Sequence, residues 1–131
     1  MKLRNGFYHI EDTTSTEGET SYGIRLDAQH AIYRAHFPGN PITPGVCIIQ
    51  LVAELLEQLT GRSLRLKRVV NVKFQHVLSP VEHATCRVVF RSIESEGRTW
   101  RIKAVVRDSE IQFAQLSMHF EEACSDESEE R

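Results

Sequence analysis

The sequence of 131 residues predicts one α+β domain in which an antiparallel sheet wraps around a single long helix. Three observations lead to this fold class. One segment in the first half of the chain has the apolar spacing of a buried helix. Runs in the second half alternate between apolar and polar residues, and short polar connections separate them. Because 40% of the residues are hydrophobic, a chain of this length can bury a core of its own.

The part of the chain before the helix is polar and contains many turn-forming residues. Residues 13–20 consist of threonine, serine, glutamate and glycine, and they predict a turn or loop between two strands. Residues 22–28 and 31–35 are predicted to be short strands. Early strands, one helix and a later run of strands give the element order of an α+β domain.

Residues 46–59 form the one convincing helix of the sequence. Apolar residues recur there at intervals of three and four, which places them on one face, and further apolar residues widen that face. A helix that is apolar over so much of its circumference is buried inside the fold. Thr60 and Gly61 supply the signal that ends it. The apolar positions are Val46, Ile48, Ile49, Leu51, Val52, Ala53, Leu55, Leu56 and Leu59.

Four strand-like runs follow the helix, at residues 69–78, 85–93, 100–106 and 114–120. In the last three, apolar side chains on alternate positions predict strands with one buried face. The connections at residues 95–97 and 108–109 are typical of hairpins. Residues 121–131 contain six acidic residues and one basic residue, so they predict a disordered tail after a domain of residues 1–120.

Composition and charge exclude several classes of function. The net charge of −2 gives no indication of nucleic-acid binding, and no apolar run is long enough to span a membrane. Residues 1–6 lack the apolar stretch of a signal peptide, so a cytoplasmic protein is expected. The three cysteines, Cys47, Cys86 and Cys124, are widely spaced, so neither a disulfide framework nor a metal cluster is expected.

Cys47 lies in the first turn of the predicted helix and has two interpretations. The partial positive charge at a helix N-terminus can lower the pKa of a thiol and make it a nucleophile. The favoured interpretation is a small buried apolar residue, which is the usual role of a free cysteine.

Residues 36–45 hold a histidine in front of a stiff, irregular loop. Three prolines follow His36, and the last of them, Pro44, precedes Gly45 and the predicted helix. Proline fixes φ and continues neither a helix interior nor a strand ladder, so this loop can hold the imidazole against the helix N-terminus. The N–H groups at that end point outward and carry partial positive charge. A base beside such donors suits chemistry at a carbonyl compound.

The same segment resembles the signature of the 3-hydroxyacyl-acyl-carrier-protein dehydratases, the hot-dog-fold enzymes of fatty-acid synthesis. The resemblance extends over residues 31–120 and implies a hot-dog fold with no metal and no cofactor. It implies that His36 removes the α-proton of a 3-hydroxyacyl thioester. It also implies that the N–H groups of Gly45 and Val46 hold the thioester oxygen and substrate. The positions that match the signature and shape its loop are His36, Phe37, Pro38, Gly39, Pro41, Pro44 and Gly45.

Two positions of the helix depart from this signature. The family has a catalytic carboxylic acid fourteen residues after the histidine and a glutamine four residues later, whereas this chain has Gln50 and Glu54 there. An amide has no titratable proton and cannot act as a general acid. Glu54 lies one helical turn from Gln50 on the same face, so it either replaces the missing acid or only pairs with the amide. The resemblance assigns both residues to the catalytic site.

The resemblance implies a lyase that removes water from 3-hydroxyacyl thioesters carried by acyl carrier protein or coenzyme A. It implies a homodimer in which each site takes its histidine from one chain and its helix acid from the other. A heterodimer or a higher oligomer is the alternative.

Two other functions stay open. Because the acid is exchanged, one hypothesis is a weak or inactive subunit that binds the acyl chain or the carrier protein and pairs with an active partner. The other is a hot-dog thioesterase, which uses a carboxylate to activate water. A basic run after the helix is either an ordinary charged connection or a patch for an acidic carrier protein. That run consists of Arg62, Arg65, Lys67 and Arg68.

Overall fold

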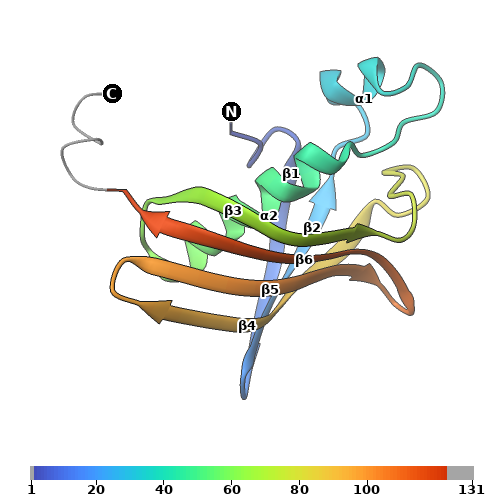
Figure 1. Cartoon of the computed structure of the whole chain (residues 1–131). Helices are drawn as coiled ribbons and strands as arrows, with labels where there is room; N and C mark the ends of the chain where they lie inside the picture. Colours follow the sequence, from blue (N-terminus) through green and yellow to red (C-terminus); the bar gives the residue numbers. More distant parts are fainter. Residues whose placement is uncertain (1, 124–131) are drawn as a thin grey trace.

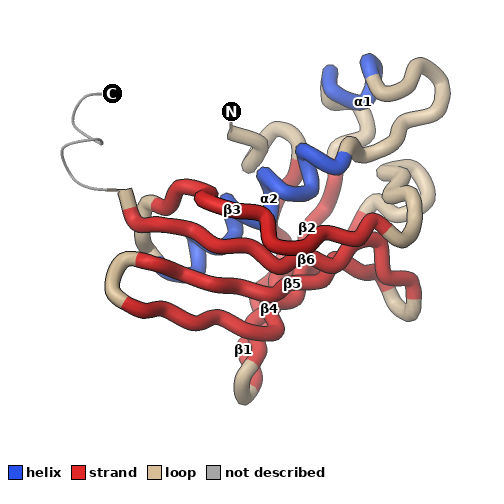
Figure 2. The backbone as a smooth tube through the Cα atoms, viewed as in Figure 1, coloured by secondary structure: helices blue, strands red, loops and turns tan. Residues whose placement is uncertain are grey.

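The computed structural model describes residues 2–123. These residues form a short helix, a long helix and one six-stranded sheet (Figures 1 and 2). The elements in chain order are β1 (Tyr8–Thr16), β2 (Glu19–Leu26), α1 (Ala31–Ala35), α2 (Gly45–Thr60), β3 (Leu64–Phe74), β4 (Thr85–Glu96), β5 (Thr99–Asp108) and β6 (Ile111–Glu122).

All neighbouring strands of the sheet are antiparallel, in the order β1-β2-β4-β5-β6-β3. The sheet curves around α2, while α1 and the loop after it stand beyond one end of the strands (Figure 1). Strands β1 and β3 form the two edges. The predicted α+β class, an antiparallel sheet wrapped around one long helix, is confirmed, and this is the hot-dog fold.

A single hydrophobic core joins α2 to the inner face of the sheet. The helix begins at Gly45 and ends at Thr60, and Gly61 caps it with a φ of 69°, the left-handed conformation that glycine adopts without strain. Both ends agree with the prediction to within one residue. The buried side chains of α2 are Cys47, Ile48, Leu51, Val52, Glu54, Leu55 and Leu56.

The prediction of a strand at residues 31–35 is wrong, because these residues form α1. The side chain of His30 caps this helix, its Nδ1 accepting a hydrogen bond from the N–H of Ile32 at 3.0 Å. Tyr33 is buried, and its ring stacks on that of Phe7 with centroids 4.8 Å apart. One helical turn is too short to show a periodic pattern, so tertiary packing determines its conformation.

The early hairpin is longer than predicted. Strands β1 and β2 pair from Tyr8 opposite Leu26 to Thr16 opposite Glu19, so only the residues between them form the turn. Residues 13–16, which the sequence assigns to a loop, are therefore the end of a strand.

Strand β3 begins five residues earlier than predicted and ends four residues earlier. Arg65, Lys67 and Arg68 therefore belong to a strand, which corrects the interpretation of the basic run as a connection. Glu121 and Glu122, assigned to the tail, belong to β6. Ala123 follows β6, and residues 124–131 of the predicted tail, including Cys124, lie outside the described residues.

Strand β3 exposes apolar side chains along one edge of the fold. Its residues Leu66, Val69 and Phe74 share the inner face of the sheet with the core, yet they are between 38% and 51% exposed. Val70 on β3 and Val46 on α2 are also exposed. We refer to these five residues as the β3 flank. Among the described residues, no helix is long and apolar enough to cross a membrane.

Candidate active site

Main-chain hydrogen bonds fix the loop that follows His36. The Phe37 N–H donates to the Asn40 carbonyl at 3.2 Å, and the Asn40 N–H donates back to the Phe37 carbonyl at 2.8 Å. The Ile42 N–H closes a wider turn on the His36 carbonyl at 2.8 Å. Gly39 has a φ of 78°, which glycine adopts without strain, and the His36–Phe37 peptide bond is cis. The backbone therefore holds His36 at one end of a closed turn.

Buried contacts attach this loop to the core. The hydroxyls of Tyr33 and Thr43 form a hydrogen bond of 2.7 Å, and the Thr43 N–H donates to the Leu78 carbonyl at 2.9 Å. Burial raises the pKa of the Tyr33 phenol, so it stays protonated at neutral pH. Tyr33 precedes His36 in the chain and Thr43 follows it, so these contacts hold the loop of His36 at both of its ends.

The N-terminus of α2 leaves main-chain donors unused. Pro44 is the N-cap residue, and no side chain caps the helix. The Pro44 carbonyl accepts from the N–H groups of Cys47 and Ile48. Within the part of the chain that the structure describes, the N–H groups of Gly45 and Val46 have no hydrogen-bond acceptor. They are the free donors expected at a helix N-terminus.

A largely apolar groove of about 460 Å³ brings the loop and the helix N-terminus together. His36 lies in its wall, and Pro44 and Gly45 lie there too. An imidazole and the free N–H of a helix thus line one groove that apolar side chains shape. The complete lining is His36, Phe37, Ile42, Thr43, Pro44, Gly45, Ile48, Phe74, Gln75, His76, Val77 and Leu78.

Two residues of this groove were missed by sequence reasoning. His76 adds a second imidazole, whose Nδ1 lies 3.0 Å from the Gln112 carbonyl. Phe74 lies over the helix N-terminus, because a Cβ added to Gly45 would come 2.7 Å from the Phe74 ring. Phe74 is the last residue of β3 and His76 lies just after it, about thirty positions after the signature loop. Their periodic strand pattern indicates a sheet and gives no sign of a site.

Gln50 and Glu54 do not line this groove. The Gln50 Nε2 donates to a Glu54 oxygen at 2.8 Å, which confirms that the two side chains share one face of α2. Glu54 is only 8% exposed, although it is a carboxylate in an apolar helix. Within one chain, the structure therefore brings His36 and Gly45 together and leaves Gln50 and Glu54 apart from them.

The Glu54 carboxylate accepts four hydrogen bonds. Besides Gln50, the N–H groups of Leu3 and Arg4 donate at 2.7 Å and 2.9 Å, and the Tyr8 hydroxyl donates at 3.0 Å. Burial, and then the neighbouring carboxylate, raise the pKa of the Tyr8 phenol, so this hydroxyl remains a donor. Four donors leave no acceptor of a Glu54 proton nearby. The arrangement suits an ionised carboxylate that fastens the N-terminal segment to α2.

Comparison with known proteins identifies the family of this chain. The sequence model of the ApeI-like family, described as ApeI dehydratase, matches residues 12–113. The chain belongs to the ApeI-like dehydratase family. A 3-hydroxyacyl-acyl-carrier-protein dehydratase, FabZ of Latilactobacillus sakei, is 28% identical over 103 residues, covering 73% of this chain and 74% of that protein. These matches confirm the resemblance to the 3-hydroxyacyl-acyl-carrier-protein dehydratases and indicate a lyase of the dehydratase type.

Solved structures share the fold of this ApeI-like chain. A chain of the dehydratase heterocomplex ApeI:P from Xenorhabdus doucetiae superposes with a TM-score of 0.64 and 20% identity, covering 82% of this chain and 91% of that one. A putative thioesterase from Silicibacter gives a TM-score of 0.57 and 14% identity, covering 91% of this chain and 81% of that one. The fold thus occurs both in a dehydratase complex and in a putative thioesterase, and the fold alone does not choose between these activities.

The remaining residues that the sequence assigned to a site lie around the groove of His36 or at the opposite end of α2. Val46 is 65% exposed in the first turn of α2, and Cys47 beside it is buried, which raises the pKa of its thiol. Pro38, Gly39 and Pro41 line a shallow hollow on the other side of Phe37.

The basic run pairs with the end of β6. Arg62 lies 3.6 Å from Glu122, and Arg65 and Lys67 lie 3.9 Å and 3.4 Å from Glu121. Arg68, by contrast, has no ion pair among the described residues. Three of these four cations are therefore already balanced by acidic groups of the chain itself.

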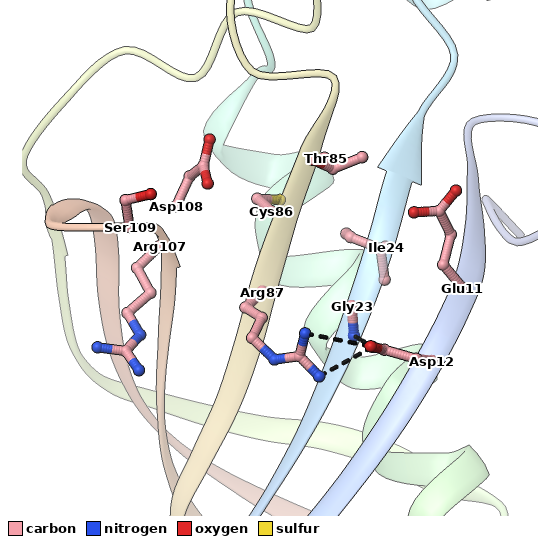
Figure 3. Close-up of a pocket in the computed structure, with 10 residues that line it drawn as sticks. All are labelled: Glu11, Asp12, Gly23, Ile24, Thr85, Cys86, Arg87, Arg107, Asp108 and Ser109. Atoms are coloured by element: carbon pink, nitrogen blue, oxygen red, sulfur yellow. Dashed lines mark hydrogen bonds and ion pairs between the residues drawn. The ribbon is translucent and has the colours of Figure 1, made fainter.

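A polar hollow beside β1, β2, β4 and β5 has a structural role (Figure 3). Arg87 donates to the Asp12 carboxylate at 2.8 Å, and this interaction lowers the pKa of Asp12. The Gly23 N–H also donates to Asp12, at 3.0 Å, and a side chain at Gly23 would overlap that carboxylate. Arg107 points away from this pair (Figure 3). The described residues contain no group of three or more His, Cys, Asp or Glu side chains that could hold a metal ion.

Proposed function

We propose that this chain supplies the base and the oxyanion donors of a site that removes water from 3-hydroxyacyl thioesters in lipid synthesis. The observation that carries the proposal is the apolar groove that His36 shares with the free N–H of Gly45. The imidazole takes the α-proton, and the N–H stabilises the enolate oxygen that forms on the thioester. The apolar walls accept the acyl chain.

The second half of the elimination needs a proton that the chain does not offer at the expected position. When the enolate collapses, the double bond forms between Cα and Cβ, and the 3-hydroxyl leaves as water only if it gains a proton. A carboxylic acid supplies this proton in the family pattern. Gln50 cannot supply it, and Glu54 is held by four donors away from the groove.

Dehydration and hydrolysis assays test this proposal directly. The purified chain is given a 3-hydroxyacyl thioester and a saturated acyl thioester, and formation of the enoyl thioester and release of thiol are followed separately. We expect slow dehydration, because the chain supplies the base and the oxyanion donors but no acid at the expected position. We expect His36→Ala to lower this rate further, by ~10²–10⁴-fold, while the fold is retained, because this exposed loop residue supplies the base. Thiol release from the saturated substrate without dehydration would make the protein a thioesterase instead.

A second candidate function is that of one subunit in a pair of different hot-dog chains. The exposed β3 flank is suited to pairing with a second chain, because an edge strand with apolar side chains can extend its sheet onto another subunit. The resemblance implies that the helix acid reaches the histidine of the other subunit. A partner chain with a carboxylic acid at the position of Gln50 would then complete the His36 site, which a homodimer cannot do. The heterocomplex of the structurally similar ApeI:P dehydratase supports this pairing.

Subunit complementation tests the shared site. A chain that carries both His36→Ala and Gln50→Glu is mixed with the wild-type chain. Each homodimer lacks either the base or the acid, whereas the mixed dimer has one site with both. We expect the turnover of the mixture to exceed the sum of the two separate proteins by at least tenfold. Additive rates in a demonstrated mixed dimer would show that the acid does not cross between subunits.

The carrier of the thioester is the last part of the proposal. Exposed ion pairs contribute only ~0–1 kcal/mol, so an acidic carrier protein could replace Glu121 as the partner of Arg65 and Lys67 at little cost. If the basic run binds such a carrier, kcat/KM should fall with added salt for the carrier-protein substrate and change far less for the coenzyme A substrate. Equal salt dependence for both substrates would argue against this surface.

A further inference from the structure

A hollow of about 360 Å³ lies on the face of the sheet turned away from α2. Side chains alternate between the two faces of a strand, so Lys103, which lies between the buried residues Ile102 and Ala104, points outward. Gln115, between the buried residues Ala114 and Leu116, points outward in the same way. We refer to this site as the outer hollow. It is lined by Val70, Asn71, Arg91, Lys103, Ala104, Val105, Gln115, Leu116 and Ser117.

Irregular pairing at both sides produces the concave shape. The register shifts between Phe90 and Ser92 in β4 and between Val69 and Asn71 in β3. A β-bulge bends its strand and increases the local twist, so two bulges on either side of β5 and β6 leave a depression between them. Val105 forms part of the floor and is only 5% exposed.

Every polar side chain that lines the outer hollow can donate a hydrogen bond. Arg91 and Lys103 bring positive charge, and Asn71, Gln115 and Ser117 bring amide and hydroxyl donors. No carboxylate is among the lining residues that the structure describes. The composition of the hollow therefore suits an anion with several oxygens.

The cations of the hollow are poorly compensated by the chain itself. Lys103 has no ion pair among the residues described, and Arg91 has only a loose one, 3.6 Å from Glu19 on the exposed surface. Further along the same two strands, Arg107 lies opposite Arg87, whose charge Asp12 balances. Because the whole chain has a net charge of −2, this concentration of positive charge is local.

We propose that the outer hollow binds the phosphate groups of a small molecule that carries a diphosphate. Arginine and lysine with amide and hydroxyl donors match phosphate oxygens. Neighbouring strands lie about 4.8 Å apart, so a hollow across four strands extends over about 14 Å, which is more than one phosphate covers. The outer hollow shares no lining residue with the groove of His36, so this is a site separate from the catalytic groove.

Titration with inorganic pyrophosphate at constant ionic strength tests the proposal. Calorimetry and the shift of the unfolding temperature are measured for the wild type, Lys103→Gln and Arg91→Gln. We expect pyrophosphate to bind more tightly than inorganic phosphate, and each substitution to weaken it about tenfold or more, because each removes a charge-assisted hydrogen bond. Arg101→Gln is the matched control, since Arg101 lies on the same strand, pairs with Glu94 and Glu96, and does not line the hollow.

Glu19→Gln adds a test in the opposite direction. It removes the carboxylate beside Arg91, so pyrophosphate should bind several-fold more tightly. Adenosine diphosphate, used as a second probe, should bind at least as tightly as pyrophosphate if the site accepts a nucleoside diphosphate. The proposal is overturned if pyrophosphate does not bind the wild type, if phosphate binds more tightly, or if Arg101→Gln weakens binding as much as Lys103→Gln does.

Discussion

The first turn of α2 and the turn around Glu54 belong to the same helix but differ in the hydrogen bonding of their polar groups. At the first turn, the N–H groups of Gly45 and Val46 have no acceptor among the described residues, and Gly45 lines an apolar groove. Nine residues later, the Glu54 carboxylate accepts four hydrogen bonds inside the fold. One part of the helix is open to a ligand, and the other is closed by the chain itself.

This difference separates a site from a structural contact. A buried polar group that is fully hydrogen-bonded stabilises one arrangement of the chain, and removing a partner costs the desolvation of what remains. Donors left unused beside an imidazole can interact only with solvent or substrate. Substitutions at Glu54 should therefore change stability more than turnover, and substitutions at Gly45 should do the reverse.

The largest effect is expected for Glu54→Gln. An amide has one carbonyl oxygen, and its NH₂ group would face main-chain N–H groups that are donors themselves. At least two of the four hydrogen bonds are lost, so we expect the free energy of unfolding to fall by about 2–4 kcal/mol. Urea denaturation of the variant and the wild type measures this change, and exposed Glu82→Gln is the matched control, with no expected change.

Measuring the turnover of the Glu54→Gln protein shows whether the structural role of Glu54 is wrong. If the folded variant keeps its stability and loses dehydration by ~10²-fold, Glu54 acts as the displaced acid and the comparison along the helix fails. A role for Glu54 limited to pairing with Gln50 would predict almost no change in stability. The three donors from the N-terminal segment are what turn this substitution into a destabilising one.

For Gly45→Ala we expect the reverse pattern with smaller magnitudes: turnover changes more than stability. The new methyl group would meet the Phe74 ring, which is 51% exposed and can turn away. The strain is partly offset by the better helix propensity of alanine, so the free energy of unfolding should change by no more than about 1 kcal/mol. Because the ring then moves within the groove, turnover should fall about tenfold. Steady-state kinetics and urea denaturation on the same preparation separate the two quantities.

Two further variants make the Gly45 test specific. Adding Phe74→Leu to Gly45→Ala should restore part of the turnover by making room for the methyl group. Gly61→Ala is the matched control at the other end of α2, where a φ of 69° makes any side chain strained. It should lower stability by about 1 kcal/mol without altering turnover. Equal loss of turnover in both alanine variants would mean that the effect reflects the helix as a whole.

The parts of the fold predicted from the sequence are those with regular apolar spacing over most of their length. Helix α2 and strands β4 to β6 show such spacing, although β4 has a bulge between Phe90 and Ser92, and their predicted positions are confirmed to within three residues. Strand β3 contains two bulges, between Leu66 and Arg68 and between Val69 and Asn71, which break the alternation, so its first half looked like a charged connection. Helix α1 is a single turn whose conformation depends on packing of Tyr33.

The candidate site divides in the same way. The loop of residues 36–45 could be found because its prolines, glycines and histidine are contiguous in the sequence. Phe74 and His76 could not be assigned to it, because they approach the loop only through the pairing of β3 in the sheet. The donors to Glu54 come from positions about 50 residues away, so no local pattern could show that this carboxylate is already satisfied.

The smallest expected effect concerns Cys47, which lies in the open first turn of α2 but faces the core. The helix N-terminus favours a thiolate, whereas burial disfavours it, and burial prevails because it raises the pKa of the thiol. Iodoacetamide at pH 7.5 should therefore alkylate Cys47 at least ~100-fold more slowly in the native protein than in urea, as followed by peptide mass spectrometry. Cys86, whose pKa burial raises to about 12, serves as the internal control and should react as slowly. If Cys47 were alkylated faster in the native protein than in urea, it would be a reactive nucleophile beside the groove. The open part of the helix would then extend to Cys47.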